Sequence, residues 1–262
     1  MTPDPEVAAR PDDRDALGAP TDGVTAGDAV LRPVREQNAF EETVSRLLQT
    51  IRLGLVAPGE ALPPERDLAT RLAVSRDTVR SAITSLAEAG YLVSRRGRYG
   101  GTFVSDVLPT PRPLGHLDDG QSRPSGTDIE DALVFRSILE VGAARAAAGR
   151  TLTAGERELL WSSLGESRAA AGDDYRRLDS RLHLVIGELT GSPSLLAALA
   201  DNRMRVNLLL DGIPLLERNI RHSNEQHERI TIAVLAGDPE GAASAMSEHL
   251  DGSAALLRGF LA

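Results

Sequence analysis

The sequence predicts a mainly α-helical protein made of two folded units, a small unit of three helices and a β-hairpin, and a larger all-α antiparallel helical bundle. Three observations support this architecture. Apolar residues recur at helical spacing through most of the chain. Two short apolar runs joined by a glycine-rich turn occur near residues 91–105. A segment rich in proline and glycine separates the two helical regions, and 262 residues suffice for two cores.

Composition and charge divide the chain into four segments. Residues 1–38 have a net charge of −4 and are predicted to be a disordered acidic tail. Residues 39–106, with a net charge of +1, form the small unit; residues 107–126 are the linker, and residues 127–262 the bundle. The chain has no cysteine, which excludes disulfides, thiolate metal sites and cysteine nucleophiles. Because no apolar run reaches about 20 residues and no leader is visible, we expect a soluble cytoplasmic protein without a membrane segment.

The small unit begins with three predicted helices. Apolar residues at i, i+4, i+7, i+8 and i+11 from Phe40 indicate a first helix that ends near Gly54. A second covers residues 65–72. Ser75 is a good N-cap for a third helix, and Gly90 has the place of the residue after its C-cap.

A β-hairpin follows these helices. Residues 91–93 indicate a strand, residues 96–101 a tight turn and residues 102–105 the returning strand. Three helices followed by a hairpin predict a winged helix-turn-helix.

The larger unit is predicted to be entirely helical because its helix-start signals are clear. About six short helices are expected, which is typical of an antiparallel bundle. The signals are the capping boxes Thr127-x-x-Glu130 and Thr153-x-x-Glu156, the pairs Ser192-Pro193 and Asp238-Pro239, a start at Asp173 and a break near Ile213-Pro214.

Arginines on the third helix have the layout of a recognition helix. Arg76 and Arg80 are four residues apart and share a face, with Thr78 near the same N-terminal end. Such fork donors reach guanine edges in the major groove, while the apolar side holds the helix on its scaffold. Arg66 begins the second helix, and Gly97 lies at the wing tip. Three further arginines flank this glycine: Arg95, Arg96 and Arg98. Solvated surface charge is the alternative, but six arginines on one face favour DNA binding.

Residues 62–105, LPPERDLATRLAVSRDTVRSAITSLAEAGYLVSRRGRYGGTFVS, resemble the DNA-binding domain of the GntR family of bacterial regulators. LPxER, the VSR-x-x-VR segment and the glycine-rich wing occur together at the family's spacing. The resemblance implies a sequence-specific transcriptional regulator, expected to be a repressor, that binds a palindromic operator as a homodimer. It also implies DNA contacts at Arg66, Arg76, Thr78, Arg80 and Gly97, to which we add Arg96.

Four side chains of the larger unit have the character of metal ligands. Asp179 and His183 are four residues apart on an apolar helix face, where unpartnered polar groups would be costly. His227 and His249 lie beside apolar positions on two later helices. Four oxygen and nitrogen ligands from three helices suit Zn²⁺ or another divalent ion. Each histidine alone is more typical of a hydrogen-bonded core residue.

Residues 128–258 resemble the FCD domain, the C-terminal ligand-binding domain of the FadR subgroup of GntR regulators. Asp179, His183, His227 and His249 fall on the metal-ligand positions of that domain. Arg136 also lies on an apolar face, where it either pairs with Glu140 or binds a carboxylate. The resemblance implies that Arg136 binds the effector, a small organic acid.

The sequence therefore predicts a DNA-binding regulator whose bundle binds a divalent metal and a small carboxylate effector. One alternative is a regulator with a purely structural metal and a non-carboxylate effector or none. A long acyl-CoA effector is disfavoured by the intact set of metal ligands. A metallohydrolase would need a placed general base such as the glutamate of HExxH, and because we find none, the chain is predicted not to be an enzyme.

Overall fold

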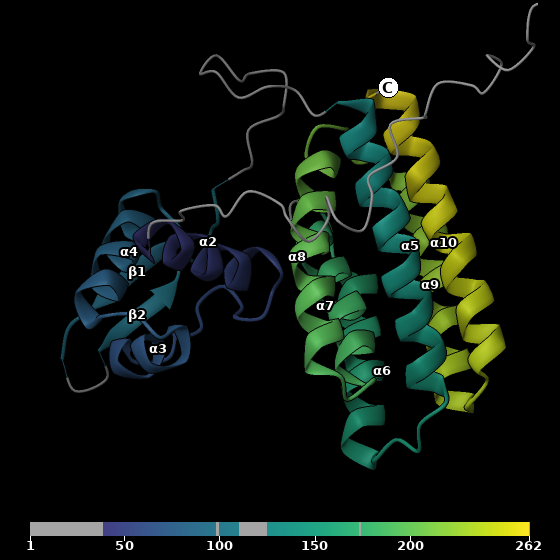
Figure 1. Cartoon of the computed structure of the whole chain (residues 1–262), viewed down its shortest axis with the longest axis horizontal. Helices are drawn as coiled ribbons and strands as arrows, with labels where there is room; N and C mark the ends of the chain where they lie inside the picture. The colour runs from purple at the N-terminus through teal and green to yellow at the C-terminus, as the bar shows by residue number, and fades with distance from the viewer. Residues whose placement is uncertain (1–38, 98–99, 110–124, 173, 262) are drawn as a thin grey trace, which may run out of the picture. The chain divides into compact units, whose positions relative to one another are not determined.

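The structure is a computed structural model that describes residues 39–97, 100–109, 125–172 and 174–261. The predicted tail, most of the predicted linker, Arg98 and Asp173 lie outside these residues. Within the described residues the chain is mainly α-helical, with one two-stranded antiparallel sheet (Figure 1). The predicted fold class is therefore confirmed.

The small unit is a winged helix-turn-helix. Its elements are α2 (Ala39–Arg52), α3 (Glu65–Leu72), α4 (Arg76–Glu88), β1 (Leu92–Arg95) and β2 (Gly101–Val104). The side chain of Ser75 caps α4 by accepting a hydrogen bond from the backbone N–H of Thr78, as predicted. Gly90 follows the C-cap of α4 with a φ of 84°, a conformation that favours glycine. One apolar core joins all five elements and includes Ile51, Val79 and Leu92.

The wing is an antiparallel hairpin in which Leu92 pairs with Val104 and Arg95 with Gly101. An isolated bridge between Ala61 and Phe103 ties the segment before α3 to the outer edge of this hairpin. The guanidinium of Arg95 lies 4.4 Å from the centre of the Phe103 ring, a cation–π contact that restrains this arginine on the wing.

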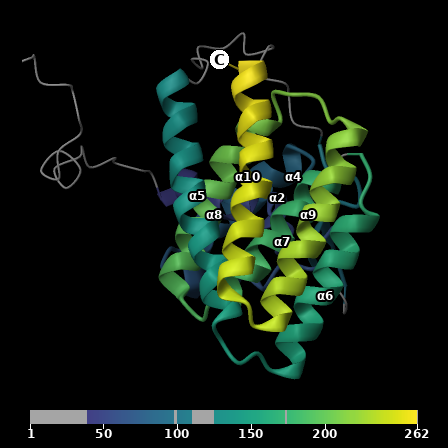
Figure 2. The same ribbon diagram turned by 90° about the vertical axis from the view of Figure 1, so that its right-hand side faces the viewer.

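The larger unit is a bundle of six helices in two layers. The helices are α5 (Gly126–Ala148), α6 (Ala154–Ala169), α7 (Asp174–Glu188), α8 (Pro193–Leu210), α9 (Glu217–Ala236) and α10 (Pro239–Leu261). Figure 2 shows α5, α10, α9 and α6 side by side, with α7 and α8 behind them. Helix α7 lies at the centre, and every residue from 182 to 187 on it is buried.

Most predicted helix starts of the bundle are confirmed. Thr153 forms a capping box with Glu156, and Ser192 caps α8 ahead of Pro193. The predicted box at Thr127 is wrong: Ser125 is the N-cap of α5, and Asp128 completes the box. The sequence offers both boxes two residues apart, and the Ser125 box gains an additional contact between the Ser125 hydroxyl and the Asp128 carboxylate at 2.7 Å. Helix α5 consequently begins at Gly126, inside the predicted linker.

The interior of the bundle contains a buried polar layer between two apolar clusters. One apolar cluster includes Ala144, Leu184 and Met246, and the other includes Leu133, Val206 and Leu257. Between them lie buried polar side chains from five helices: Arg136, Glu140, Asp179, Ser180, His183, Asn202, Arg203, Asn207, Gln226, His227 and His249. Buried polar groups need partners, so this layer is where a bound ion or ligand would be accommodated.

Candidate metal centre

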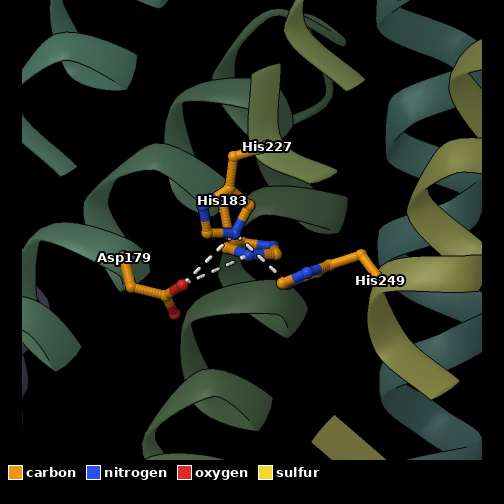
Figure 3. A group of neighbouring side chains, drawn as sticks. All are labelled: Asp179, His183, His227 and His249. Carbon is orange, nitrogen blue, oxygen red and sulfur yellow. Dashed lines mark hydrogen bonds and ion pairs between the residues drawn. The ribbon is translucent and has the colours of Figure 1, made fainter. Parts of the chain in front are cut away.

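Asp179, His183, His227 and His249 converge in the polar layer (Figure 3). Helix α7 supplies the first two side chains, α9 the third and α10 the fourth. All four are buried, and each offers one ligand atom within 4.8 Å of the others. The structure thus brings together the four residues that the sequence singled out.

The carboxylate of Asp179 presents one oxygen to the histidines. Its Oδ1 lies 3.3 Å from Nε2 of His227 and 3.9 Å from Nε2 of His183. The other oxygen, Oδ2, accepts a hydrogen bond from Arg203. Oδ1 is therefore available to an ion.

Contacts on the far side of two rings direct their Nε2 atoms at the centre. Nδ1 of His249 lies 3.1 Å from Oε1 of Gln226 and donates to it, because this oxygen is an acceptor only. Nδ1 of His183 faces Oε2 of Glu140 at an ion-pair distance of 2.5 Å. Both rings then direct Nε2 at the centre, and in His249, which donates from Nδ1, this nitrogen is unprotonated, as metal ligation requires.

A further observation indicates that the site suits a cation. Among the described residues Nε2 of His183 is buried and has no hydrogen-bond partner. Nε2 of His227 and Nε2 of His249 face each other at 3.2 Å. A divalent ion bound by these nitrogens and by Asp179 would satisfy all three, since imidazole and carboxylate are zinc ligands.

The charge states at neutral pH also suit a metal. Burial lowers the pKa of His227 to about 3, although the charge of Asp179 opposes this shift. Burial, reinforced by the neighbouring His227 and His183, holds the pKa of His249 well below its usual value. Burial alone would raise the pKa of Asp179, but the positive charge of the adjacent Arg203 opposes this effect, and the pKa is lowered. Neutral imidazoles and an ionised carboxylate are the forms that bind metal.

Arg136 lies beside the centre and pairs with Glu140. Its Nε donates to Oε1 of Glu140 at 3.0 Å, and its Nη1 donates to Oγ of Ser253 at 2.7 Å. Arg136 also lines a cavity of about 70 Å³ together with Asp179 and His249. The ion pair is therefore present, and Arg136 also borders a cavity that two of the four ligand residues line.

Sequence reasoning missed Arg203 of α8, which is fully buried and contacts Asp179. Leu199 and Val206 flank it at positions i−4 and i+3, and this spacing places it on the apolar face of the helix. The same signal that singled out Arg136 would thus have found Arg203. His222, which lies off the ligand pattern, has a side chain that is 62% exposed.

The predicted DNA-contact residues lie on exposed parts of the winged unit. Arg66 is at the start of α3, and Arg76, Thr78 and Arg80 are in the first five residues of α4. The three arginines are exposed and Thr78 is half-buried. Arg96 and Gly97 follow β1, and Gly97 has a φ of 109°. Both are exposed at the wing.

No helix in the described part of the chain is long and apolar enough to cross a membrane.

Comparison with protein families matches both units. The profile of "Bacterial regulatory proteins, gntR family" matches residues 40–104, and that of the FCD domain matches residues 131–252. These ranges correspond to the winged unit and to most of the bundle.

Similar proteins are regulators. The "Putative L-lactate dehydrogenase operon regulatory protein" of Escherichia coli (strain K12) is 28% identical over 233 residues, covering 80% of this chain and 83% of its own length. The "HTH-type transcriptional repressor NanR" of Cronobacter sakazakii is 29% identical over 232 residues, covering 84% and 85%. The solved structure of E. coli McbR/YncC has a TM-score of 0.52 at 19% identity, covers 85% of this chain and 98% of its own, and supports the fold alone.

Proposed function

The chain belongs to the GntR family of bacterial regulatory proteins and has a C-terminal FCD domain; from this premise we propose a repressor whose bundle binds a divalent metal, zinc, and a small carboxylate effector. The matched families and the similar proteins are transcription regulators, so the chain is a DNA-binding transcriptional regulator and not an enzyme. Since such a regulator acts on the chromosome, we place it in the cytoplasm.

The convergence of four buried ligand atoms from three helices carries the metal proposal. Asp179, His183, His227 and His249 would hold the ion, and it would supply a positive charge and open coordination positions for an effector oxygen. Among the common divalent ions without redox chemistry, a set of three imidazoles and one carboxylate favours zinc.

The charge of the site favours an anionic effector. The guanidiniums of Arg136 and Arg203 balance the carboxylates of Glu140 and Asp179 in the buried layer. A divalent ion would then add two positive charges that no nearby side chain offsets, and a bound carboxylate would reduce this excess. The adjacent cavity is bordered by Arg136 and by Tyr175. Burial raises the pKa of Tyr175, so its hydroxyl stays protonated and can donate to an anion.

The first experiment is a thermal-shift screen of metal-loaded protein against mono-, di- and tricarboxylates. A ligand at 100 times its Kd adds about 2.7 kcal/mol to the unfolding free energy, which is readily measured. We expect a shift that disappears with a chelator and weakens in Arg136→Ala. The substitution Arg258→Ala, at an exposed ion pair on the same bundle, is the control.

A purely structural metal is the second candidate, favoured by the position of the ligands in the bundle interior between two apolar clusters. In that case the chelator lowers the melting temperature but no carboxylate raises it. The same screen therefore separates the two functions.

We further propose that the repressor binds a palindromic operator as a homodimer. The contacts with DNA would come from the exposed residues of the winged unit: Arg66, Arg76, Thr78, Arg80, Arg96 and Gly97. The second copy would bind the outer side of α5, where Val134 and Ile138 have exposed fractions of 56% and 67%. Exposed apolar side chains grouped on one helix are typical of an interface.

A further inference from the structure

We infer that Glu140 and Arg203 are positioning residues of the metal centre: Glu140 holds His183, and Arg203 holds Asp179, each with its ligand atom directed at the ion. This inference rests on the proposed metal site. Neither residue is one of the four ligands. Both are buried in the polar layer, on helices α5 and α8, which supply no ligand themselves.

Glu140 has both carboxylate oxygens engaged. Oε2 lies 2.5 Å from Nδ1 of His183, and Oε1 accepts from Nε of Arg136 at 3.0 Å and lies 3.6 Å from Nη1 of Arg203. Burial alone would raise the pKa of Glu140, but the positive charges of Arg136 and Arg203 oppose this effect and the pKa is lowered, so the group stays ionised. A carboxylate bound to the remote nitrogen of a ligating histidine fixes the ring and increases its basicity.

Arg203 contacts Asp179, the second ligand that helix α7 supplies. Its Nη2 donates to Oδ2 of Asp179 and also to Oγ of Ser180 at 3.1 Å. With Oδ2 held in this way, Oδ1 is the oxygen that faces Nε2 of His227. Asp179 would therefore bind the ion through one oxygen.

The two residues also connect the ligands to the effector arginine. Glu140 contacts Arg136, Arg203 and His183, and so links the guanidinium at the cavity to a metal ligand.

The test measures Co²⁺ binding to the full chain by titration and by the visible absorption spectrum, which reports the geometry around the ion. The variants are Glu140→Gln, Arg203→Lys and Arg203→Met. If a single variant fails to fold, the double variant Glu140→Gln with Arg203→Met replaces it. The double variant removes one buried charge of each sign and so keeps the layer neutral. Glu130→Gln is the control, since Glu130 is on α5 but pairs with exposed Arg258.

We expect Glu140→Gln and Arg203→Met to weaken Co²⁺ binding by ~10–100-fold and to alter the spectrum. Arg203→Lys keeps the charge and should recover part of the affinity, whereas Glu130→Gln should match the wild type. Variants that fold and bind Co²⁺ with wild-type affinity and spectrum would overturn the positioning role of Glu140 and Arg203 but leave the metal centre in place. A wild-type chain that takes up neither Co²⁺ nor Zn²⁺ would overturn the metal centre and this inference with it.

Discussion

Arg80 is held by two carboxylates near the start of the recognition helix. Its guanidinium lies 3.0 Å from Glu65 and 3.4 Å from Asp77, while 60% of the side chain stays exposed. These contacts hold the side chain at the surface of the helix-turn-helix, but an exposed ion pair contributes little to stability. The residue is therefore available to exchange its carboxylate partners for a base edge.

Substitution Arg80→Ala should weaken specific operator binding without unfolding the chain. Loss of a bidentate contact to a guanine costs about 1–3 kcal/mol of discrimination. The measurement is a fluorescence anisotropy titration with specific and scrambled duplexes, with circular dichroism as the check on folding. Arg71→Ala, at another exposed arginine of the same unit, is the control. Equal affinity of Arg80→Ala and wild type for the specific duplex would contradict the assignment.

Substitution His227→Ala should strongly reduce the bound metal. This side chain belongs to the set of four converging ligand atoms, and its Nε2 is 3.3 Å from Asp179. Metal content by mass spectrometry after gel filtration gives the occupancy. His222→Ala is the matched control on the same helix, because His222 is mostly exposed. Full occupancy in His227→Ala would remove it from the ligand set.

At the scale of the element, the sequence predicted which segments are helical better than where one of them begins. Periodicity and caps located the helices, because these signals depend on neighbouring residues. Helix α5 has two candidate boxes, and the choice of Ser125 over Thr127 could not be made from local sequence. The contacts of Arg203 with Asp179 and Glu140 were also out of reach, because periodicity identifies a buried face but not the helix packed against it.

The start of α5 can be tested by removing each candidate cap. Ser125→Ala removes the acceptor of the Asp128 backbone N–H and should lower the unfolding free energy by about 1 kcal/mol. Thr127→Ala should change it by less than about 0.5 kcal/mol, as expected for an exposed site without a cap. Chemical denaturation of both variants gives the comparison, and a larger loss in Thr127→Ala would reverse the assignment.

At the scale of the whole molecule, the buried histidines make the stability of the metal-free protein depend on pH. The pKa of His227 is about 3 in the folded chain and about 6.5 in an unfolded one. At a pH between these two pKa values the unfolded chain binds more protons than the folded chain. The unfolding free energy therefore falls as the pH drops below about 6.5. The slope approaches about 1.4 kcal/mol per pH unit for one such histidine.

Urea titrations of chelator-treated protein between pH 7.5 and pH 5 measure this dependence. His227→Gln should flatten the slope, while His222→Gln, at a mostly exposed side chain, should leave it unchanged. A wild-type slope equal to that of His227→Gln would show that His227 does not titrate as the structure indicates.

The outer side of α5 determines whether the regulator can form the proposed dimer. Ile138 lies at its centre, Asp131 and Arg145 lie seven residues to either side, and both are exposed. Within the chain, Asp131 pairs with Arg205 and Arg145 pairs with Glu240. A second α5 crossing antiparallel at Ile138 would place these two ion pairs opposite each other at each end. Gly142 would allow the backbone of a second α5 to approach closely. Within the described chain nothing lies within 4 Å of the position that its Cβ would take, so no contact there explains a glycine in mid-helix.

Ile138→Asp should therefore convert the dimer to a monomer, since it buries a charge in the apolar centre of the interface. Sedimentation velocity gives the mass, and Ile232→Asp, at an isoleucine of α9 with an exposed fraction of 52%, is the matched control. The monomer should lose its preference for a two-half-site operator over a single half-site, because two winged units would no longer be linked. A variant that remains dimeric would place the interface elsewhere.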